Sequence, residues 1–393
     1  MSLTLSTLRL FQFSVAFFLI GCVTVCPVLK AQEVYFGGVG FISWDDREQL
    51  FPQTSKMLCR AKKCSHGNID TLARPFFQNM SYNNFKLGTK VGTEQAEGII
   101  MAPMISRESV GIVKDETGYI HEYRLFASVM FFKFGTDNRF IASRPVLYRI
   151  LDVLDHKATE EEQFAMFASM LGYGEKRKNN LFQLLAAASK DVDPSVIAEK
   201  YAQVKINNLD DTVKNIISKD YDEASWKVQV AQIFESFLIK ETRAPLIPSI
   251  SETQVTDNLQ GTFQEASYEI KLPEPWFKIG VDVNLFKAFE KVKGPSKNYC
   301  PAVKIALNIG SELESLLKSS FTRTRRSCTV VAASKYMPPL FFFQGSLYSL
   351  LSRLSKQFGD NPADRFLEDS NPDSKSIEDQ IKAVKDQVFK TGL

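Results

Sequence analysis

Apolar and polar residues alternate most regularly in residues 277–285. The apolar residues there occupy every second position: Phe277, Ile279, Val281, Val283 and Leu285. Successive side chains of a β-strand point to opposite faces, so the pattern predicts a strand with one buried face. The other face is expected to lie in water or against a partner. Residues 302–309 repeat the pattern.

A helix is predicted over residues 312–326, before a further strand at 328–333. Ser311 and Glu314 have the spacing of a capping box. An apolar stripe follows at helical spacing: Leu313, Leu316, Leu317 and Phe321. With the apolar segment that begins near Ala244, these elements predict an α/β domain over residues 244–358.

Strands also dominate the predicted N-terminal domain, residues 32–150. An apolar run with glycines at 34–42 predicts a buried strand, and further strands are expected at 98–104, 109–114 and 119–134. The turn ending at Gly118 predicts a hairpin. The acidic residues that follow Ser43 suit the first turn of a helix: Asp45, Asp46 and Glu48.

The segment between these domains, residues 151–243, is predicted to be helical. Thr159 and Glu162 have capping-box spacing, and Phe164, Phe167 and Leu171 follow at helical spacing. Four further helices are predicted in order, at residues 181–189, 194–204, 210–218 and 224–240. The fold class is therefore α/β or α+β, with two sheet-containing regions linked by a helical segment. A duplication would explain two such regions, but no repeat of individual residues supports it.

The C-terminal residues, 359–393, are predicted to form a linker and a helix. Residues 360–375 are rich in Asp, Asn, Ser and Pro, and the apolar positions of the helix come after them: Ile377, Ile381, Val384 and Val388. This stripe spans about two heptads, which is short for an isolated coiled coil. Docking on the chain's own domain is therefore favoured over self-association.

Residues 1–31 have the pattern of a secretory signal peptide. Arg9 precedes an apolar run at 11–29, and Ala31 offers a small residue for cleavage. Two alternatives remain. Residues 19–22 resemble a bacterial lipobox, which would place a lipid anchor on Cys22, and the run approaches the roughly 20 residues of a membrane-spanning helix. The favoured localisation is the periplasm or the extracellular space, and a membrane-anchored lipoprotein is the alternative.

The composition is that of a globular protein. The 393 residues are 44% hydrophobic and 24% charged, and the formal net charge is +3. A dedicated nucleic-acid binder usually has a strong basic excess, so no nucleic-acid partner is expected.

The cysteines beyond the predicted signal peptide (the leader, residues 1–31) predict disulfides, in agreement with export. Cys59 and Cys64 bracket a short basic segment, and Cys300 and Cys328 each begin a predicted strand. If one helix joins those two strands, they run parallel and their starts lie side by side. The predicted pairs are Cys59–Cys64 and Cys300–Cys328, and unpaired buried thiols are the alternative. Neither pair has the CxxC spacing of a zinc site.

The sequence carries no motif of a catalytic, cofactor or metal site. With three histidines in the chain, a histidine-rich metal centre is not expected. Residues 37–40 contain three glycines but lack dinucleotide-binding spacing. His121 beside Glu122 is interpreted as a solvated surface pair. No catalytic residue, cofactor or metal is therefore assigned.

Two segments are candidates for contact with a partner. A basic cluster ends the predicted helix at 312–326, where cations also suit the helix dipole: Arg323, Arg325 and Arg326. An aromatic run follows two prolines: Phe341, Phe342 and Phe343. Three consecutive phenylalanines cannot all face one core from a strand, so burial under a second layer and exposure as a contact patch compete.

These features favour an exported, periplasmic cell-envelope protein with a non-enzymatic interaction or assembly role and a protein partner. The alternative is a secreted hydrolase whose carboxylates come from distant parts of the chain. Such a site would leave no sequence motif.

Overall fold

The computed structural model describes most of the chain beyond the predicted leader. The described residues are 32–42, 46–59, 67–88, 98–115, 118–135, 138–174, 179–218, 222–249, 258–263, 266–323, 328–332, 339–362, 365–371 and 374–389. The chain from Glu33 onward forms one compact unit. The leader, with Cys22, lies outside the described residues. Within those residues, every helix is too short or too polar to cross a membrane.

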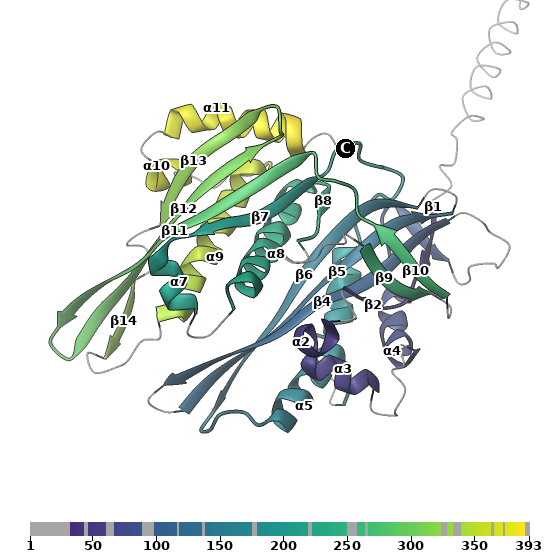
Figure 1. The fold of residues 1–393 in the computed structure, drawn as a ribbon, viewed down its shortest axis with the longest axis horizontal. Coiled ribbons are helices and arrows are strands. Elements are labelled where there is room, and N and C mark those ends of the chain that lie inside the picture. The colour runs from purple at the N-terminus through teal and green to yellow at the C-terminus, as the bar shows by residue number, and fades with distance from the viewer. Residues whose placement is uncertain are drawn as a thin grey trace, which may run out of the picture. The chain divides into compact units, whose positions relative to one another are not determined.

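The first half of the chain builds a sheet with the order β3-β1-β4-β5-β6, and β2 also pairs with β4 (Figure 1). Strand β4 runs parallel to β1 and β2, whereas β4, β5 and β6 form an antiparallel meander. The elements of this half are β1 (Gln32–Phe36), β2 (Gly40–Phe41), α2 (Arg47–Leu50), α3 (Pro52–Cys59), α4 (Gly67–Gln78), β3 (Phe85–Gly88), β4 (Gly98–Asp115), β5 (Gly118–Phe134), β6 (Arg139–Leu154), α5 (Glu160–Leu171) and α6 (Leu181–Ala188).

The second half builds a sheet with the order β13-β12-β11-β7-β8, and β14 pairs with β12. Strand β11 runs parallel to β7, whereas β11, β12 and β13 form an antiparallel meander. The elements are β7 (Ala202–Leu209), α7 (Asp211–Ile217), α8 (Glu223–Thr242), β8 (Leu246–Ile247), the separate hairpin β9 (Asn258–Phe263) and β10 (Ala266–Lys271), β11 (Phe277–Lys293), β12 (Ser296–Gly310), β13 (Ser315–Arg323), β14 (Thr329–Ala332), α9 (Pro339–Phe358), α10 (Phe366–Ser370), α11 (Ser374–Val384) and a π-helical turn (Lys385–Phe389).

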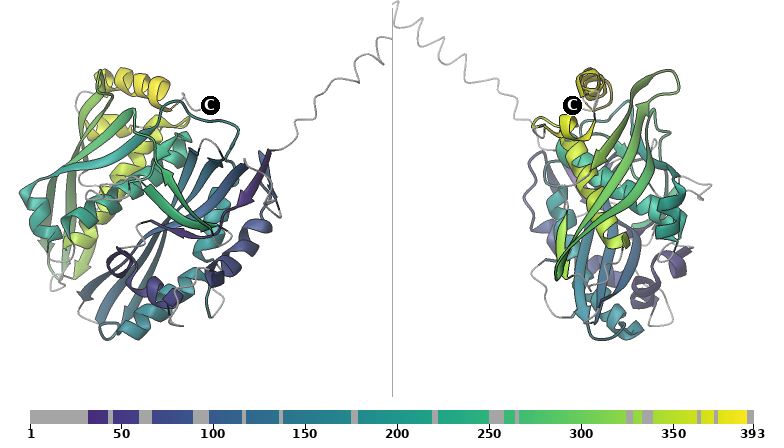
Figure 2. Two further views of the ribbon diagram at one scale, coloured as in Figure 1. Left: turned by 45° about the vertical axis from the view of Figure 1, so that its right-hand side comes forward. Right: turned by 90° about the vertical axis from the view of Figure 1, so that its left-hand side faces the viewer.

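Helices α8 and α9 join the two halves through polar contacts. The Arg124 guanidinium on β5 donates hydrogen bonds to Gln229 on α8 and Gln344 on α9, at 3.3 and 3.1 Å. Helix α8 also contacts β6 of the first sheet and β7 of the second. In both views of Figure 2, α9 and α11 lie against the strands of the second sheet. The two sheets therefore share a layer of helices.

Two of the predicted helices are not helical. Residues 312–326 were expected to be helical, but β13 occupies Ser315–Arg323 and pairs with β12. The Ser311 hydroxyl accepts hydrogen bonds from the Leu313 and Glu314 amides, so the capping signal is real but closes a β-hairpin turn. Residues 194–204 were also predicted as a helix, but residues 194–201 form turns and irregular backbone, and β7 begins at Ala202. Strand pairing overrides local helix preference in β13, which pairs with β12, and at the start of β7, which pairs with β11.

Three predictions are confirmed. Strand β11 alternates as expected as far as Val283, and the apolar positions 277, 279, 281 and 283 are buried; Leu285, predicted on the same face, follows a β-bulge and is only half-buried, and Phe286 joins the core instead. Helix α11 docks on its own half, because its apolar residues join the core of the second sheet. The Cys300 and Cys328 sulfurs lie 2.04 Å apart, which is compatible with the predicted disulfide. The reasoning behind that pair was wrong, since Cys328 precedes β14, which runs antiparallel to β12.

Candidate functional site

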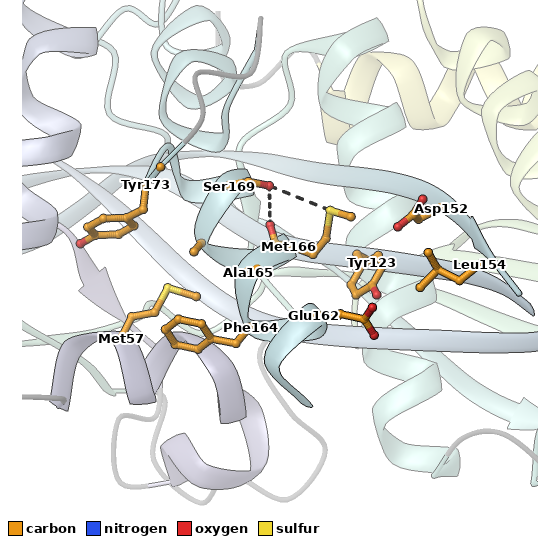
Figure 3. Close-up of a pocket in the computed structure, with 12 residues that line it drawn as sticks. Met57, Tyr123, Asp152, Leu154, Glu162, Phe164, Ala165, Met166, Ser169 and Tyr173 are labelled. Carbon is orange, nitrogen blue, oxygen red and sulfur yellow. Dashed lines mark hydrogen bonds between the residues drawn. The ribbon is translucent and has the colours of Figure 1, made fainter. Parts of the chain in front are cut away.

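A cavity of about 740 Å³ lies between α3, α5 and the outer ends of β5 and β6 (Figure 3). Its wall is mostly apolar, with a few polar groups. It is lined by Met57, Tyr123, Asp152, Leu154, Glu162, Phe164, Ala165, Met166, Ala168, Ser169, Tyr173 and Gly174. Cavities of this size that are apolar with few polar groups are the usual sites for small ligands and side chains.

Helix α5 builds one wall of the cavity, and its capping box fixes where the helix begins. The Thr159 hydroxyl accepts a hydrogen bond from the Glu162 amide, and the Glu162 carboxylate accepts one from the Thr159 amide. Phe167, further along the same helix, is buried, and its ring meets that of Tyr123 on β5 edge to face, with the two ring centres 5.7 Å apart. The cap and this aromatic contact together hold Glu162 at one end of the cavity.

The cavity has an acidic end and an apolar end. Figure 3 shows Asp152, Glu162 and the Tyr123 hydroxyl at one end, and Met57, Phe164 and Tyr173 at the other. Burial and the two neighbouring carboxylates raise the pKa of Tyr123 to about 12. The phenol therefore stays neutral at physiological pH and keeps its proton for donation. Hydrogen bonds from the Thr159 amide and from His156 lower the pKa of Glu162, which keeps this group ionised.

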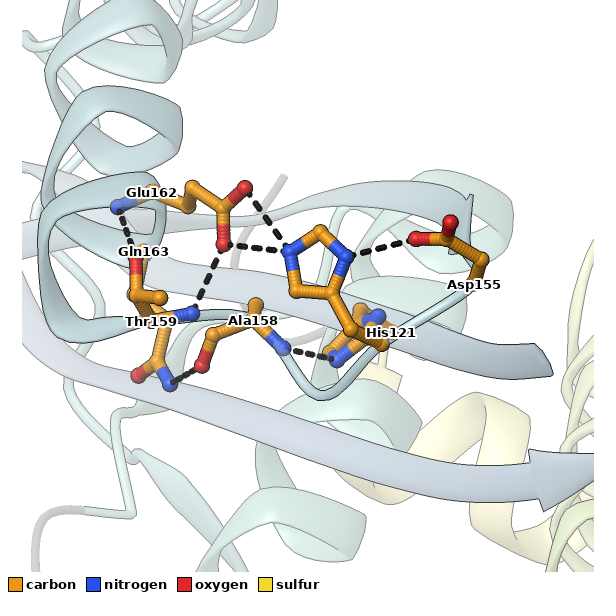
Figure 4. A network of polar contacts seen from close by, with 7 residues as sticks. His121, Asp155, Ala158, Thr159, Glu162 and Gln163 are labelled. Carbon is orange, nitrogen blue, oxygen red and sulfur yellow. Dashed lines mark hydrogen bonds and ion pairs between the residues drawn. The ribbon is translucent and has the colours of Figure 1, made fainter.

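Two histidines of opposite character lie next to residues of the acidic end, His156 beside Glu162 and His121 beside Tyr123. Figure 4 shows the polar network around His121 and Glu162. His156 is exposed and lies 2.6 Å from Asp155 and 3.0 Å from Glu162. Those carboxylates raise its pKa. His121 is fully buried, and its Nε2 accepts a hydrogen bond from the Ala158 amide at 2.9 Å. An accepting Nε2 requires a neutral ring with its proton on Nδ1, and burial lowers the pKa of His121 in agreement.

The interpretation of His121 and Glu122 as a solvated surface pair was wrong. Both side chains are buried, but on opposite faces of β5. His121 stacks on Tyr123 beside the cavity, with ring centres 6.2 Å apart. Glu122 faces the other way and forms ion pairs with Arg124 and Arg149. The two residues therefore belong to different polar clusters.

The arrangement is suited to binding an apolar group that carries a positive charge. The carboxylates at one end can accept hydrogen bonds from an ammonium or guanidinium group, and the neutral phenol can donate one to a neighbouring carbonyl oxygen of the ligand. The Ser169 hydroxyl donates a hydrogen bond to the carbonyl oxygen of Met166 in the same helix, so its hydrogen is already used within α5. Among the described residues, no group of three or more His, Cys, Asp and Glu side chains is placed to hold a metal ion.

The other sequence candidates lie away from this cavity. Phe343 is buried and stacks on Phe286 with ring centres 4.9 Å apart, whereas Phe342 is half-buried beside Tyr299. Both are on helix α9, so the strand assumed for this run was wrong. Arg323 ends β13 rather than a helix. Outside the described residues lie Arg325, Arg326, Cys64 and the side chains of Cys59 and Phe341.

Sequence reasoning missed the cavity because its residues share no local pattern. The strand register brings Asp152 opposite His121 and Leu154 opposite Tyr119. That register follows from β5–β6 pairing over their whole length, which no short motif encodes. The one signal in the sequence was the Thr159–Glu162 capping box, which located the start of α5.

Comparison with models of known protein families gives no match for this chain, and comparison with curated protein sequences gives none either.

Proposed function

We propose that this protein is an exported, non-enzymatic binding protein of the cell envelope, and that it holds an apolar, positively charged segment of a protein partner in the cavity beside α5. The observation that carries the proposal is the division of that cavity into an apolar end and an acidic end. The leader pattern and the Cys300–Cys328 pair support an oxidising, exported location.

The chemistry of the lining defines the partner segment. Met57, Phe164 and Tyr173 offer thioether and aromatic surface to a leucine or phenylalanine side chain. Asp152 and Glu162 favour a lysine or arginine side chain, or a free amino terminus, next to it. A dipeptide-sized unit with one apolar and one basic side chain is therefore the expected occupant.

A secreted hydrolase is the second candidate, because two carboxylates from different elements meet in one cavity. Paired carboxylates act in many glycoside hydrolases, in which the general acid has a raised pKa. Glu162 has a lowered pKa and a structural task in the capping box. This combination suits a fixed negative charge better than a proton donor, so binding is the better supported function.

The proposal is tested with two blocked peptides that differ in one charge, N-acetyl-Phe-Leu-Lys-amide and N-acetyl-Phe-Leu-Glu-amide. In isothermal titration calorimetry with residues 33–393, the lysine peptide is expected to bind about tenfold more tightly than the glutamate peptide. This ratio is what two partly exposed ion pairs, with Asp152 and Glu162, can contribute. Asp152→Asn with Glu162→Gln should remove this preference. Glutamine still fits the capping box, so α5 keeps its start.

Glu160→Gln is the matched control, because Glu160 lies in the same helical turn but pairs with Lys56 outside the cavity. This variant should keep the preference for lysine. Equal binding of both peptides by the unchanged protein would contradict the proposal. Hydrolysis of a glycoside or peptide substrate that disappears in the Asp152→Asn variant would favour the hydrolase instead.

A further inference from the structure

The end of the β11–β12 hairpin carries exposed apolar side chains among lysines. We call this segment the arm, and define it as residues 287–300 of β11 and β12 with residues 328–332, which include β14 (Figure 1). Phe289, Val292 and Val330 are 52%, 62% and 67% exposed. Single exposed apolar residues are common on protein surfaces, but several of them close together indicate a contact site. The exposed apolar side chains of the arm therefore call for a functional explanation.

The strand register divides these residues between the two faces of the arm. Lys287, Phe289, Lys291 and Lys293 occupy alternate positions of β11 and therefore share one face. The Lys287 ammonium lies 5.3 Å from the centre of the Phe289 ring, which agrees with that sharing. Val330 joins the same face, because it pairs with Asn298, which pairs with Lys291. We call this face the outer face.

The opposite, inner face has a different environment. Tyr299 is buried there, with its ring centre 5.2 Å from that of Phe342 on α9. Glu290, the acidic residue of this stretch of β11, also lies on the inner face and pairs with Lys297 at 3.5 Å. The outer face thus combines three exposed lysines with Phe289 and Val330, and the neighbouring acid is directed away from it.

The arm is also held in shape. Its backbone pairs β11 with β12 as far as Lys293 and Ser296, and β14 adds a third strand. Cys300, opposite Phe289, is joined to Cys328, with their Cα atoms 4.1 Å apart. A rigid hairpin presents its side chains without the loss of conformational freedom that a mobile loop would suffer on binding.

We propose that the outer face of the arm binds the surface of an anionic lipid membrane. Phe289 and Val330 would enter the boundary between headgroups and acyl chains, while Lys287, Lys291 and Lys293 contact lipid phosphates. Charge complementarity selects this partner: lysines attract an anionic surface, and the two apolar side chains between them need an apolar phase. A nucleic acid would contact the lysines but leave Phe289 and Val330 half in water. This inference does not depend on the cavity or its ligand.

The test is co-sedimentation of residues 33–393 with vesicles of phosphatidylcholine alone, or of phosphatidylcholine mixed with phosphatidylglycerol. Three lysines near an anionic surface should make binding to the mixed vesicles about 100-fold tighter. Replacement of Lys287, Lys291 and Lys293 by glutamine should reduce binding to the level of neutral vesicles. Phe289→Ser with Val330→Ser should weaken binding to the mixed vesicles about tenfold.

Val292→Ser is the matched control, because Val292 is equally exposed near the same tip but on the inner face. It should change vesicle binding less than twofold. Equal melting temperatures for all variants show that each remains folded. Equal binding to neutral and mixed vesicles, or an equal loss in Val292→Ser, would overturn the proposal. Binding to single-stranded DNA without binding to vesicles would overturn it in favour of a polyanion site.

Discussion

The two sheets are built in the same order but covered differently. Each begins with a strand and helices, adds a parallel neighbour and continues as an antiparallel meander: β1 to β4, β5 and β6 in the first, and β7 to β11, β12 and β13 in the second. In the first sheet, β5 is buried without interruption from His121 to Phe132. In the second, β11 alternates between buried and accessible residues. The order of strands therefore does not determine how many faces a sheet buries.

The number of sheet faces that helices cover determines whether the polar side chains of a strand are paired inside the protein or lie in water. Helices α5 and α6 contact one face of the first sheet, and α8 and α9 approach the other, so polar residues of β5 must find partners inside the protein. The accessible face of the second sheet leaves its lysines in water. A candidate binding cavity thus lies at the doubly covered sheet, and a candidate membrane contact lies on the singly covered one. A duplication would explain the shared order, but no repeat of individual residues supports it.

The largest expected effect comes from breaking the polar contacts between β5 and the shared helices. Arg124 is 1% exposed and pairs with Glu122, Gln229 and Gln344. Arg124→Ala should lower the free energy of unfolding by about 3–5 kcal/mol, because Glu122 keeps its buried charge and loses this partner. Urea denaturation measures the loss. Arg149→Ala removes the more exposed partner of Glu122 and should lower it by less than about 1 kcal/mol. If both variants lose the same free energy of unfolding, β5 is not enclosed between two layers of helices.

A smaller difference is expected between neighbouring phenylalanines on α9. Phe343 is buried against Phe286 in the core of the second sheet, so Phe343→Ala should lower the free energy of unfolding by about 3–4 kcal/mol. Phe342 is half-buried, and Phe342→Ala should lower it by about half as much. Thermal and urea denaturation of the two variants compare them directly. The reverse ranking would mean that α9 presents a different face to the sheet.

The sequence predicts a strand best when one face of its sheet is buried and the other is accessible. The alternation in residues 277–285 predicted β11 correctly as far as Val283, because one buried face and one accessible face leave a period of two in the sequence; the β-bulge that displaces Leu285 left no signal. Residues 312–326 predicted a helix wrongly, because Leu313, Leu316, Leu317 and Phe321 fit a helical stripe, and the pairing partner on β12 is set by tertiary structure. In β13, Leu316 and Leu317 are both buried, so the period of two is lost.

The candidate cavity could be predicted only in part, for a related reason. Thr159 and Glu162 marked the start of α5, because a capping box is local. Tyr123 and Asp152 gave no signal, because their meeting depends on the register of β5 with β6 and on helix α5 lying across both strands. His121 and Glu122 were misread as solvated, because a strand buried on both faces can hold polar residues without exposing them.

Glu235 lies on the shared helix α8 and is 1% exposed. Its carboxyl group accepts hydrogen bonds from the amide and hydroxyl of Ser249, but burial still raises its pKa from 4.5 to about 8. Between these pH values the folded protein keeps a proton that the unfolded chain has lost. The free energy of unfolding should therefore fall as pH rises through this window, by at most about 1.4 kcal/mol per pH unit for this group.

Glu235→Gln should flatten this fall, because the amide keeps the oxygen that accepts from Ser249 and cannot ionise. Urea denaturation at pH 5, 6, 7 and 8 gives the slope for each protein. Some slope should remain, since burial also raises the pKa of Glu108 and of Asp70 in the first half. Glu223→Gln makes the same substitution at the accessible start of the same helix and shows what the loss of a carboxyl group from α8 does by itself. If Glu235→Gln leaves the slope as it is in the unchanged protein, water reaches the layer between the two sheets, and the first sheet is not enclosed on its second face as its buried strand implies.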